Sequence, residues 1–156
     1  SLGDRVFLGI ATYFPSLIKF LLWLTMGRKC KDIKKLKDKI LKDAEKLPKP
    51  DKVIMQDPEI LHKFALETME AFRQGAKGAA YESQLYTKPW NFKLEDISAS
   101  MKVYLWHGGL DVNVPFETGK YVSEKIPNCH AKFYPEEAHL SVIFNHKDEI
   151  FSTIKS

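Results

Sequence analysis

Asp111 and His139 are the two residues of this chain whose types and positions fit an acid–base pair. Asp111 lies in W-H-G-G-L-D-V-N-V-P and His139 in Y-P-E-E-A-H-L-S, and each run follows a short apolar segment. Loops at the carboxyl ends of neighbouring parallel strands converge on one crevice. A carboxylate there can hold the Nδ1 proton of an imidazole and leave Nε2 free as a general base. The pattern therefore predicts a histidine that transfers protons and a carboxylate that orients it.

Both residues also have simpler interpretations. A lone histidine in a turn is more often solvated or buried in a core than catalytic, and an aspartate after two glycines is a common turn or capping residue. Their paired positions at two strand ends favour the catalytic hypothesis. We expect His107 to orient or cap the first loop. Glu136 and Glu137 are alternatives to Asp111 as the acid, although both are expected to be surface charges. The remaining histidines lack the spacing of metal ligands: His62, His130 and His146.

The elements that position the pair are two expected strands, each followed by a helix. Short apolar runs at residues 101–106 and 131–134 are typical of strands buried in a parallel sheet. Helices are expected at residues 115–126 and 141–154. Two parallel strands alone do not make a stable sheet. We therefore expect a missing N-terminal half, in the same protein or a partner chain, to supply the rest of the sheet.

Residues 1–88 are expected to be helical, and residues 89–156 form the second predicted segment. Apolar residues recur at helical spacing through the first segment, and prolines mark several boundaries. The expected helices span residues 4–14, 15–27 and 31–47, the last ended by Pro48 and Pro50, with one starting at Asp57-Pro58-Glu59 and a short one through Tyr81 and Leu85.

Three motifs in the second segment are similar to the C-terminal part of α/β-hydrolase superfamily proteins. They are Pro89–Phe92 with Leu94–Ile97, Trp106–Pro115 and Pro135–Ser141. The resemblance covers residues 89–156 and implies that Asp111 is the acid and His139 the base of a catalytic triad. It places residues 1–88 as a helical cap or lid, by position only. Ala138 stands where many members have glycine.

The resemblance implies an α/β fold class. The chain would be the C-terminal part of an α/β-hydrolase fold, with a helical cap followed by a βαβα unit of a parallel sheet. It would be incomplete without an N-terminal half. In that superfamily the chain order is nucleophile, acid, histidine, so the nucleophile is expected before this sequence.

No nucleophile motif is present in the chain itself. G-x-S-x-G, the strained elbow that exposes a catalytic serine, occurs at none of the serines, and the loop that supplies half of an oxyanion hole is also absent. The intact protein is expected to hydrolyse an ester or related small acyl substrate with a serine. This chain would supply acid and base, would be inactive alone, and would need no cofactor and no metal.

Two rival hypotheses remain. The first is a non-catalytic binding or interaction protein that keeps the α/β-hydrolase fold with a decayed nucleophile. The second is a membrane-associated helical protein anchored by residues 6–26, which are about as long as the roughly 20 residues a bilayer requires. Pro15 costs an interior helix about 3 kcal/mol, and Lys19 costs about 2.5–3.5 kcal/mol at the bilayer centre. A buried helix pair is therefore favoured, and membrane association is not expected.

Composition excludes several classes. The net charge is only +4, and its excess is concentrated in residues 28–46, so no nucleic-acid partner is expected. A solvated helix face is favoured there over a surface for anionic membranes or acidic partners. Cys30 and Cys129 lack disulfide or zinc spacing and, with no intact signal peptide, favour a cytoplasmic protein. Four aromatic residues predict either an acyl pocket or the cap's own core: Phe14, Phe20, Trp23 and Phe64.

Overall fold

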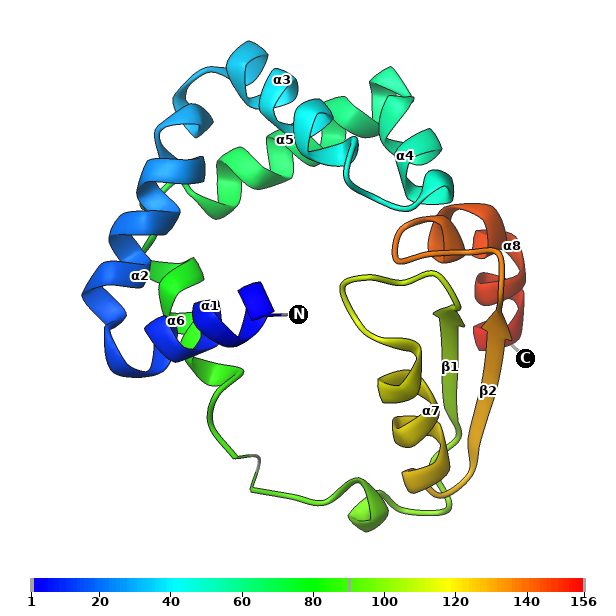
Figure 1. Ribbon diagram of the computed structural model, residues 1–156. Coiled ribbons are helices and arrows are strands. Elements are labelled where there is room, and N and C mark those ends of the chain that lie inside the picture. Colours follow the sequence, from blue (N-terminus) through cyan, green and yellow to red (C-terminus); the bar gives the residue numbers. More distant parts are fainter. Residues whose placement is uncertain (1, 90, 156) are drawn as a thin grey trace. The chain divides into compact units, whose positions relative to one another are not determined.

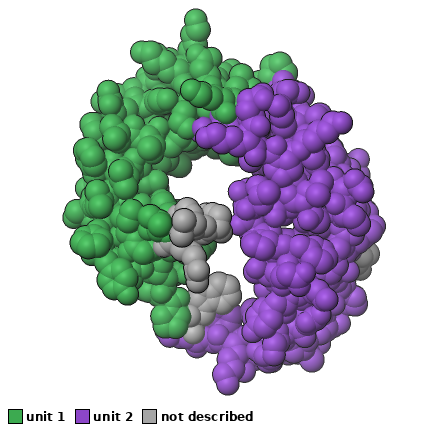
Figure 2. Space-filling view, in the orientation of Figure 1, with its two compact units in different colours: residues 1–42, 58–90 green, residues 43–57, 91–156 purple. Residues whose placement is uncertain are grey.

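The computed structural model describes the backbone of residues 2–89 and 91–155, with side chains from residue 6 onward. Trp90 of the first motif therefore lies outside the described residues, as do Ser1 and Ser156. The chain divides into two compact units (Figure 2). The first unit contains residues 1–42 and 58–90, and the second contains residues 43–57 and 91–156. The predicted functional boundary at residue 88 stays a prediction.

The first unit is built from helices. Pro15 opens α2, where a proline needs no backbone N–H partner. Helix α2 packs against α1 and α6, and the core of this group contains Ala11, Ile18 and Ala80. None of the described helices is both long enough and apolar enough to cross a membrane. The helices that begin in this unit are α1 (Leu2–Tyr13), α2 (Pro15–Leu22), the π-helical turn η1 (Trp23–Gly27), η2 (Lys29–Lys31), α3 (Ile33–Ala44), α5 (Pro58–Ala71) and α6 (Lys77–Leu85).

Helix α4 (Lys49–Gln56) belongs to the second unit and differs from the prediction. Pro48 and Pro50 were expected only to end the preceding helix. The structure instead places Pro48 at the N-cap of α4 and Pro50 in its first turn. The first helical N–H groups have no intrahelical partner, so a proline there costs no hydrogen bond. Helix α3 already ends at Ala44, four residues before Pro48, so the two prolines start α4 and do not end α3.

The rest of the second unit carries two parallel strands and two covering helices. Strand β1 (Val103–Gly108) pairs with β2 (Cys129–Tyr134). After the short helix η3 (Leu94–Asp96), the chain order is β1, α7 (Phe116–Lys125), β2, α8 (Ser141–Lys155). Successive side chains of a strand point to opposite faces. Trp106 accordingly contacts α8 while His107 lies against α7, so the two helices cover opposite faces of the sheet (Figure 1).

The predicted α/β fold class is wrong for this chain. Helices account for 64% of the structure, and the sheet in the described residues has only two strands. Alternating or continuous strand-like patterns occur in two six-residue segments, whereas most of the chain follows helical spacing. The prediction was based on the two strands and the loops that carry Asp111 and His139, although helices make up most of the molecule.

The Glu149 carboxylate of α8 is hydrogen-bonded to three side chains of the sheet. It accepts hydrogen bonds from Trp106 Nε1 at 3.3 Å, Lys132 Nζ at 2.7 Å and the Tyr134 hydroxyl at 2.7 Å. The bonds from Lys132, Tyr134 and Trp106 lower the pKa of Glu149 from 4.5 to about 2. A carboxyl whose pKa is lower in the folded state stabilises that state only while it is ionised.

Replacing Glu149 with glutamine is therefore expected to lower the melting temperature at pH 7. The stabilisation is fully present above pH 4.5 and is lost as the pH falls toward about 2, so the two proteins should converge there. Thermal unfolding followed by circular dichroism between pH 7 and pH 2 measures this. Asp148→Asn removes an equal charge from the same helix and is the control. A pH-independent difference between wild type and Glu149→Gln would contradict the prediction.

Candidate active site

Asp111 and His139 are in direct contact. Asp111 follows β1 and His139 follows β2, and the Nδ1 atom of His139 lies 2.9 Å from Oδ2 of Asp111. The Asp111 side chain is only 4% exposed, whereas the His139 side chain is 41% exposed. An ionised carboxylate only accepts hydrogen bonds, so Nδ1 carries the shared proton. The ring nitrogen Nε2 is left without a hydrogen-bond partner among the described residues.

The turn after Asp111 fixes its carboxylate. Oδ1 accepts the backbone N–H groups of Asn113 at 2.8 Å and Val114 at 2.9 Å, which leaves Oδ2 for His139. Burial of the Asp111 carboxyl opposes ionisation. The hydrogen bonds from Val114, His139 and Asn113 outweigh burial and hold the pKa of Asp111 below its ordinary value. Asp111 is therefore both a turn residue, as its simpler interpretation expected, and the ionised partner of the imidazole.

Two glycines let the loops approach each other closely. A Cβ atom on Gly108 would lie 2.5 Å from the carbonyl oxygens of Glu137 and Ala138, and one on Gly109 would lie 2.9 Å from the backbone of Pro135. Backbone bonds join the same segments, from Gly109 N to the Tyr134 oxygen at 2.7 Å and from Leu110 N to the Glu137 oxygen at 2.8 Å. The two glycines of W-H-G-G thus allow the short distance between Asp111 and His139.

His107 and Glu137 differ from their predicted roles. His107 is 8% exposed, and its ring packs between Phe116 and Phe133 and against Gly119 of α7, so it is a core residue. Glu137 is no free surface charge. Its carboxylate accepts from Asn145 at 3.1 Å and contacts His146 Nε2 at 3.2 Å.

Glu136 is exposed, as expected, and His146 stacks on Tyr134 with 3.8 Å between ring centroids. His130 stacks on Tyr104, and His62 is exposed. None of these residues contacts the pair. The described residues contain no cluster of three or more His, Cys, Asp or Glu side chains that could hold a metal ion.

Asp51 is a site residue that sequence reasoning missed. It lies in the first turn of α4 and is 0% exposed. Its Oδ1 atom accepts the backbone N–H groups of Leu140 at 2.9 Å and Ser141 at 2.8 Å, directly after His139. An acid in a first helical turn is an ordinary local signal. Its partners lie 89 and 90 residues away, and nothing in the local sequence identifies them.

An open pocket lies beside the two loops in the second unit. Its volume is about 350 Å³, and α4 together with the loops that carry the pair contributes its walls. The apolar part of the lining includes Val53, Ile54 and Leu110. Leu110 directly precedes Asp111. Neither Asp111 nor His139 is among the lining residues, which are Lys49, Pro50, Val53, Ile54, Leu110, Glu136 and Asn145.

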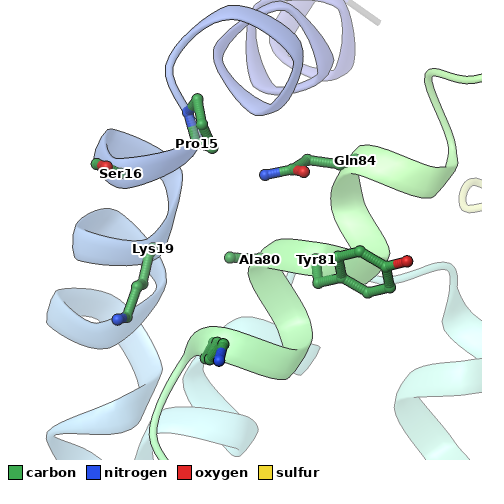
Figure 3. A pocket seen from close by; sticks show the side chains of 7 residues that line it. Pro15, Ser16, Lys19, Ala80, Tyr81 and Gln84 are labelled. Atoms are coloured by element: carbon green, nitrogen blue, oxygen red, sulfur yellow. The ribbon is translucent and has the colours of Figure 1, made fainter.

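Four aromatic residues of the first unit, which the sequence predicted to form either its core or an acyl pocket, are exposed. Phe14, Phe20, Trp23 and Phe64 are 62%, 52%, 45% and 38% exposed, so the core alternative is wrong. Phe20 and Trp23 line an open pocket of about 440 Å³, whereas Phe14 and Phe64 do not. An adjoining pocket of about 270 Å³ lies between α2 and α6, where Lys19, Ala80 and Gln84 are among the lining residues (Figure 3). An acyl-binding role for this region stays a prediction.

Comparison with known proteins gives no match: no protein-family model, no curated protein and no solved structure corresponds to this chain. Its function is therefore inferred from its own residues and their geometry.

Proposed function

We propose that this chain supplies the acid and the base of a serine-dependent hydrolase of ester or related acyl substrates. The observation that carries the proposal is the 2.9 Å contact between His139 Nδ1 and the buried, ionised Asp111 carboxylate. The motifs around both residues, Trp106–Pro115 and Pro135–Ser141, resemble the α/β-hydrolase superfamily. The exposed imidazole leaves Nε2 accessible to a reacting group.

The proposed chemistry follows from the two nitrogen atoms of His139. Nε2 takes the proton from a serine hydroxyl as that oxygen attacks the acyl carbon, and the tetrahedral intermediate forms. The imidazolium then returns the proton to the leaving group, and the acyl-enzyme remains. A water molecule releases the acyl group by the same two proton transfers. Asp111 stays ionised throughout, orients the ring and stabilises its positive form.

The nucleophile is proposed to come from polypeptide outside these 156 residues. No serine in the described part of the chain is hydrogen-bonded to His139, and G-x-S-x-G is absent from the sequence. Helix α8 supports this proposal. Its apolar residues Ile143, Phe151 and Ile154 are 55%, 61% and 62% exposed. A two-stranded parallel sheet with such a helix is marginal alone.

Labelling with a fluorophosphonate, which reacts with activated serines, tests the proposal. The isolated chain is expected to stay unlabelled. The native protein that contains these residues, recovered from its source with an antibody against residues 103–155, is expected to be labelled. His139→Ala in the native protein should suppress labelling, because the serine loses its base. Glu136→Gln, a change of an exposed carboxylate in the same loop, is the control.

Two results would contradict the proposal. Labelling of the isolated chain would place the nucleophile within these residues. A native protein that stays unlabelled, with the Asp111–His139 contact intact, would instead support the non-catalytic binding protein as the function. That alternative keeps the same geometry without an activated serine, so labelling distinguishes the two.

A further inference from the structure

Asp51 is a fully buried carboxylate, and its hydrogen bonds go to the backbone that directly follows His139. Of its two oxygens, Oδ1 accepts from Leu140 and Ser141, and Oδ2 has no partner among the described residues. Burying a carboxylate is costly unless hydrogen bonds compensate. Among the described residues, the hydrogen bonds that compensate the burial of Asp51 come only from the backbone that immediately follows His139.

The position of these hydrogen bonds explains what the carboxylate does there. Helix α8 begins at Ser141, and the first N–H groups of a helix have no partner within it. The Ser141 hydroxyl accepts the Ala138 N–H at 2.7 Å, on the other side of the histidine. Asp51 accepts the N–H groups of Leu140 and Ser141, the two residues that follow His139. The backbone on both sides of His139 is therefore held, and only its ring is left to be oriented.

A local cap would satisfy the helix without Asp51. Capping residues are commonly the Ser, Thr, Asp or Asn that precedes the first turn. Here Leu140 occupies that position, directly after His139, and a residue of α4 supplies the acceptor instead. A carboxylate from another element fixes the place of the turn as well as its hydrogen bonding.

We propose that Asp51 is a positioning residue for His139. Asp111 holds the imidazole at Nδ1, and Asp51 holds the backbone from which the imidazole projects. One carboxylate therefore acts on the side chain of His139, and the other acts on the backbone directly after it. This role rests on the proposed function, in which His139 is the base. The loss of Asp51 should loosen the His139–Asp111 contact even though Asp51 touches neither side chain.

Nitrogen and proton NMR of the His139 ring, recorded on the native protein that contains these residues, tests this inference. In the wild type the Nδ1 proton should be protected from exchange with water by its bond to Asp111. Asp51→Ala should speed that exchange tenfold or more, because the backbone next to His139 loses two hydrogen bonds. Asp51→Asn keeps an oxygen that can accept both N–H groups and should restore most of the protection. Asp51→Glu, whose acceptor is displaced by one methylene, replaces Asp51→Ala as the disruptive variant if the latter does not fold.

Met55→Ala is the matched control, because Met55 is 2% exposed on the same helix and its loss destabilises α4 without removing the carboxylate. It should leave exchange at His139 near the wild-type rate. The inference is overturned if the disruptive variant leaves the exchange rate unchanged, or if Met55→Ala speeds it equally. The experiment measures proton exchange at the His139 ring and does not depend on catalytic turnover. A native protein that fails to react with fluorophosphonate would therefore contradict the proposed function. It would not by itself produce either of the two exchange results that overturn the role of Asp51.

Discussion

Replacing Asp111 with asparagine is expected to slow hydrolysis by the native protein about 10⁴-fold, the cost typical of this change in a triad. The fold should survive, because the amide oxygen can still accept from Asn113 and Val114 as Oδ1 does. The amide cannot stabilise an imidazolium, and its NH2 group can favour the wrong tautomer of His139. Steady-state kinetics with an activated ester measures the loss, which should fall mainly on kcat.

The control for this prediction is Glu136→Gln. Glu136 is exposed and lies three residues before the histidine, so its change tests whether any nearby carboxylate serves as the acid. Its kinetics should match those of the wild type. Equal losses in Glu136→Gln and Asp111→Asn would contradict the assignment of the acid.

Gly108→Ala is expected to destabilise the chain by about 1–3 kcal/mol, the usual cost of overpacking a close contact. The new methyl group would meet the carbonyl oxygens of Glu137 and Ala138 at 2.5 Å. These atoms belong to the backbone, so no flexible side chain can move aside. The histidine loop must shift, and the distance from His139 to Asp111 must change with it. Urea unfolding measures the stability, and the His139 ring resonances report the shift.

Gly78→Ala is the matched control for this substitution. Gly78 lies in α6, and nothing is within 4 Å of a Cβ placed there. Alanine is favoured over glycine in a helix by about 1 kcal/mol, so this variant should be slightly more stable than the wild type. A Gly108→Ala protein as stable as wild type, with unchanged ring resonances, would show that the loops need no glycine at this position.

Local signals in the sequence were sufficient to find the Asp111–His139 pair. Each residue follows a short apolar run that ends in a turn, and the helix between the runs makes the strands parallel. Parallel neighbours place their carboxyl ends at one edge. The strands themselves begin two residues from the predicted starts, at Val103 and Cys129, which does not change the edge at which they end.

Local signals failed where one pattern had two meanings. A proline can end one helix or start the next, and the prediction used only the first meaning for Pro48 and Pro50. They start α4, so this helix was missed. Apolar spacing shows which residues of a helix share a face and not whether that face is covered, and Ile143 and Phe151 of α8 are 55% and 61% exposed. The predicted fold class was wrong because it was based on two clearly marked strands, although most of the chain is helical.

The amino-acid sequence by itself determined which residues could form the acid–base pair, where the chain turns around them, and that no serine elbow accompanies them. Only the tertiary structure decided that His107 is buried in a core, that Glu137 is bonded to α8, and that Asp51 holds the backbone beside His139. The physical reason is distance along the chain. Turns and helix starts depend on a few neighbouring residues, whereas a hydrogen bond across 89 residues depends on how separate elements pack.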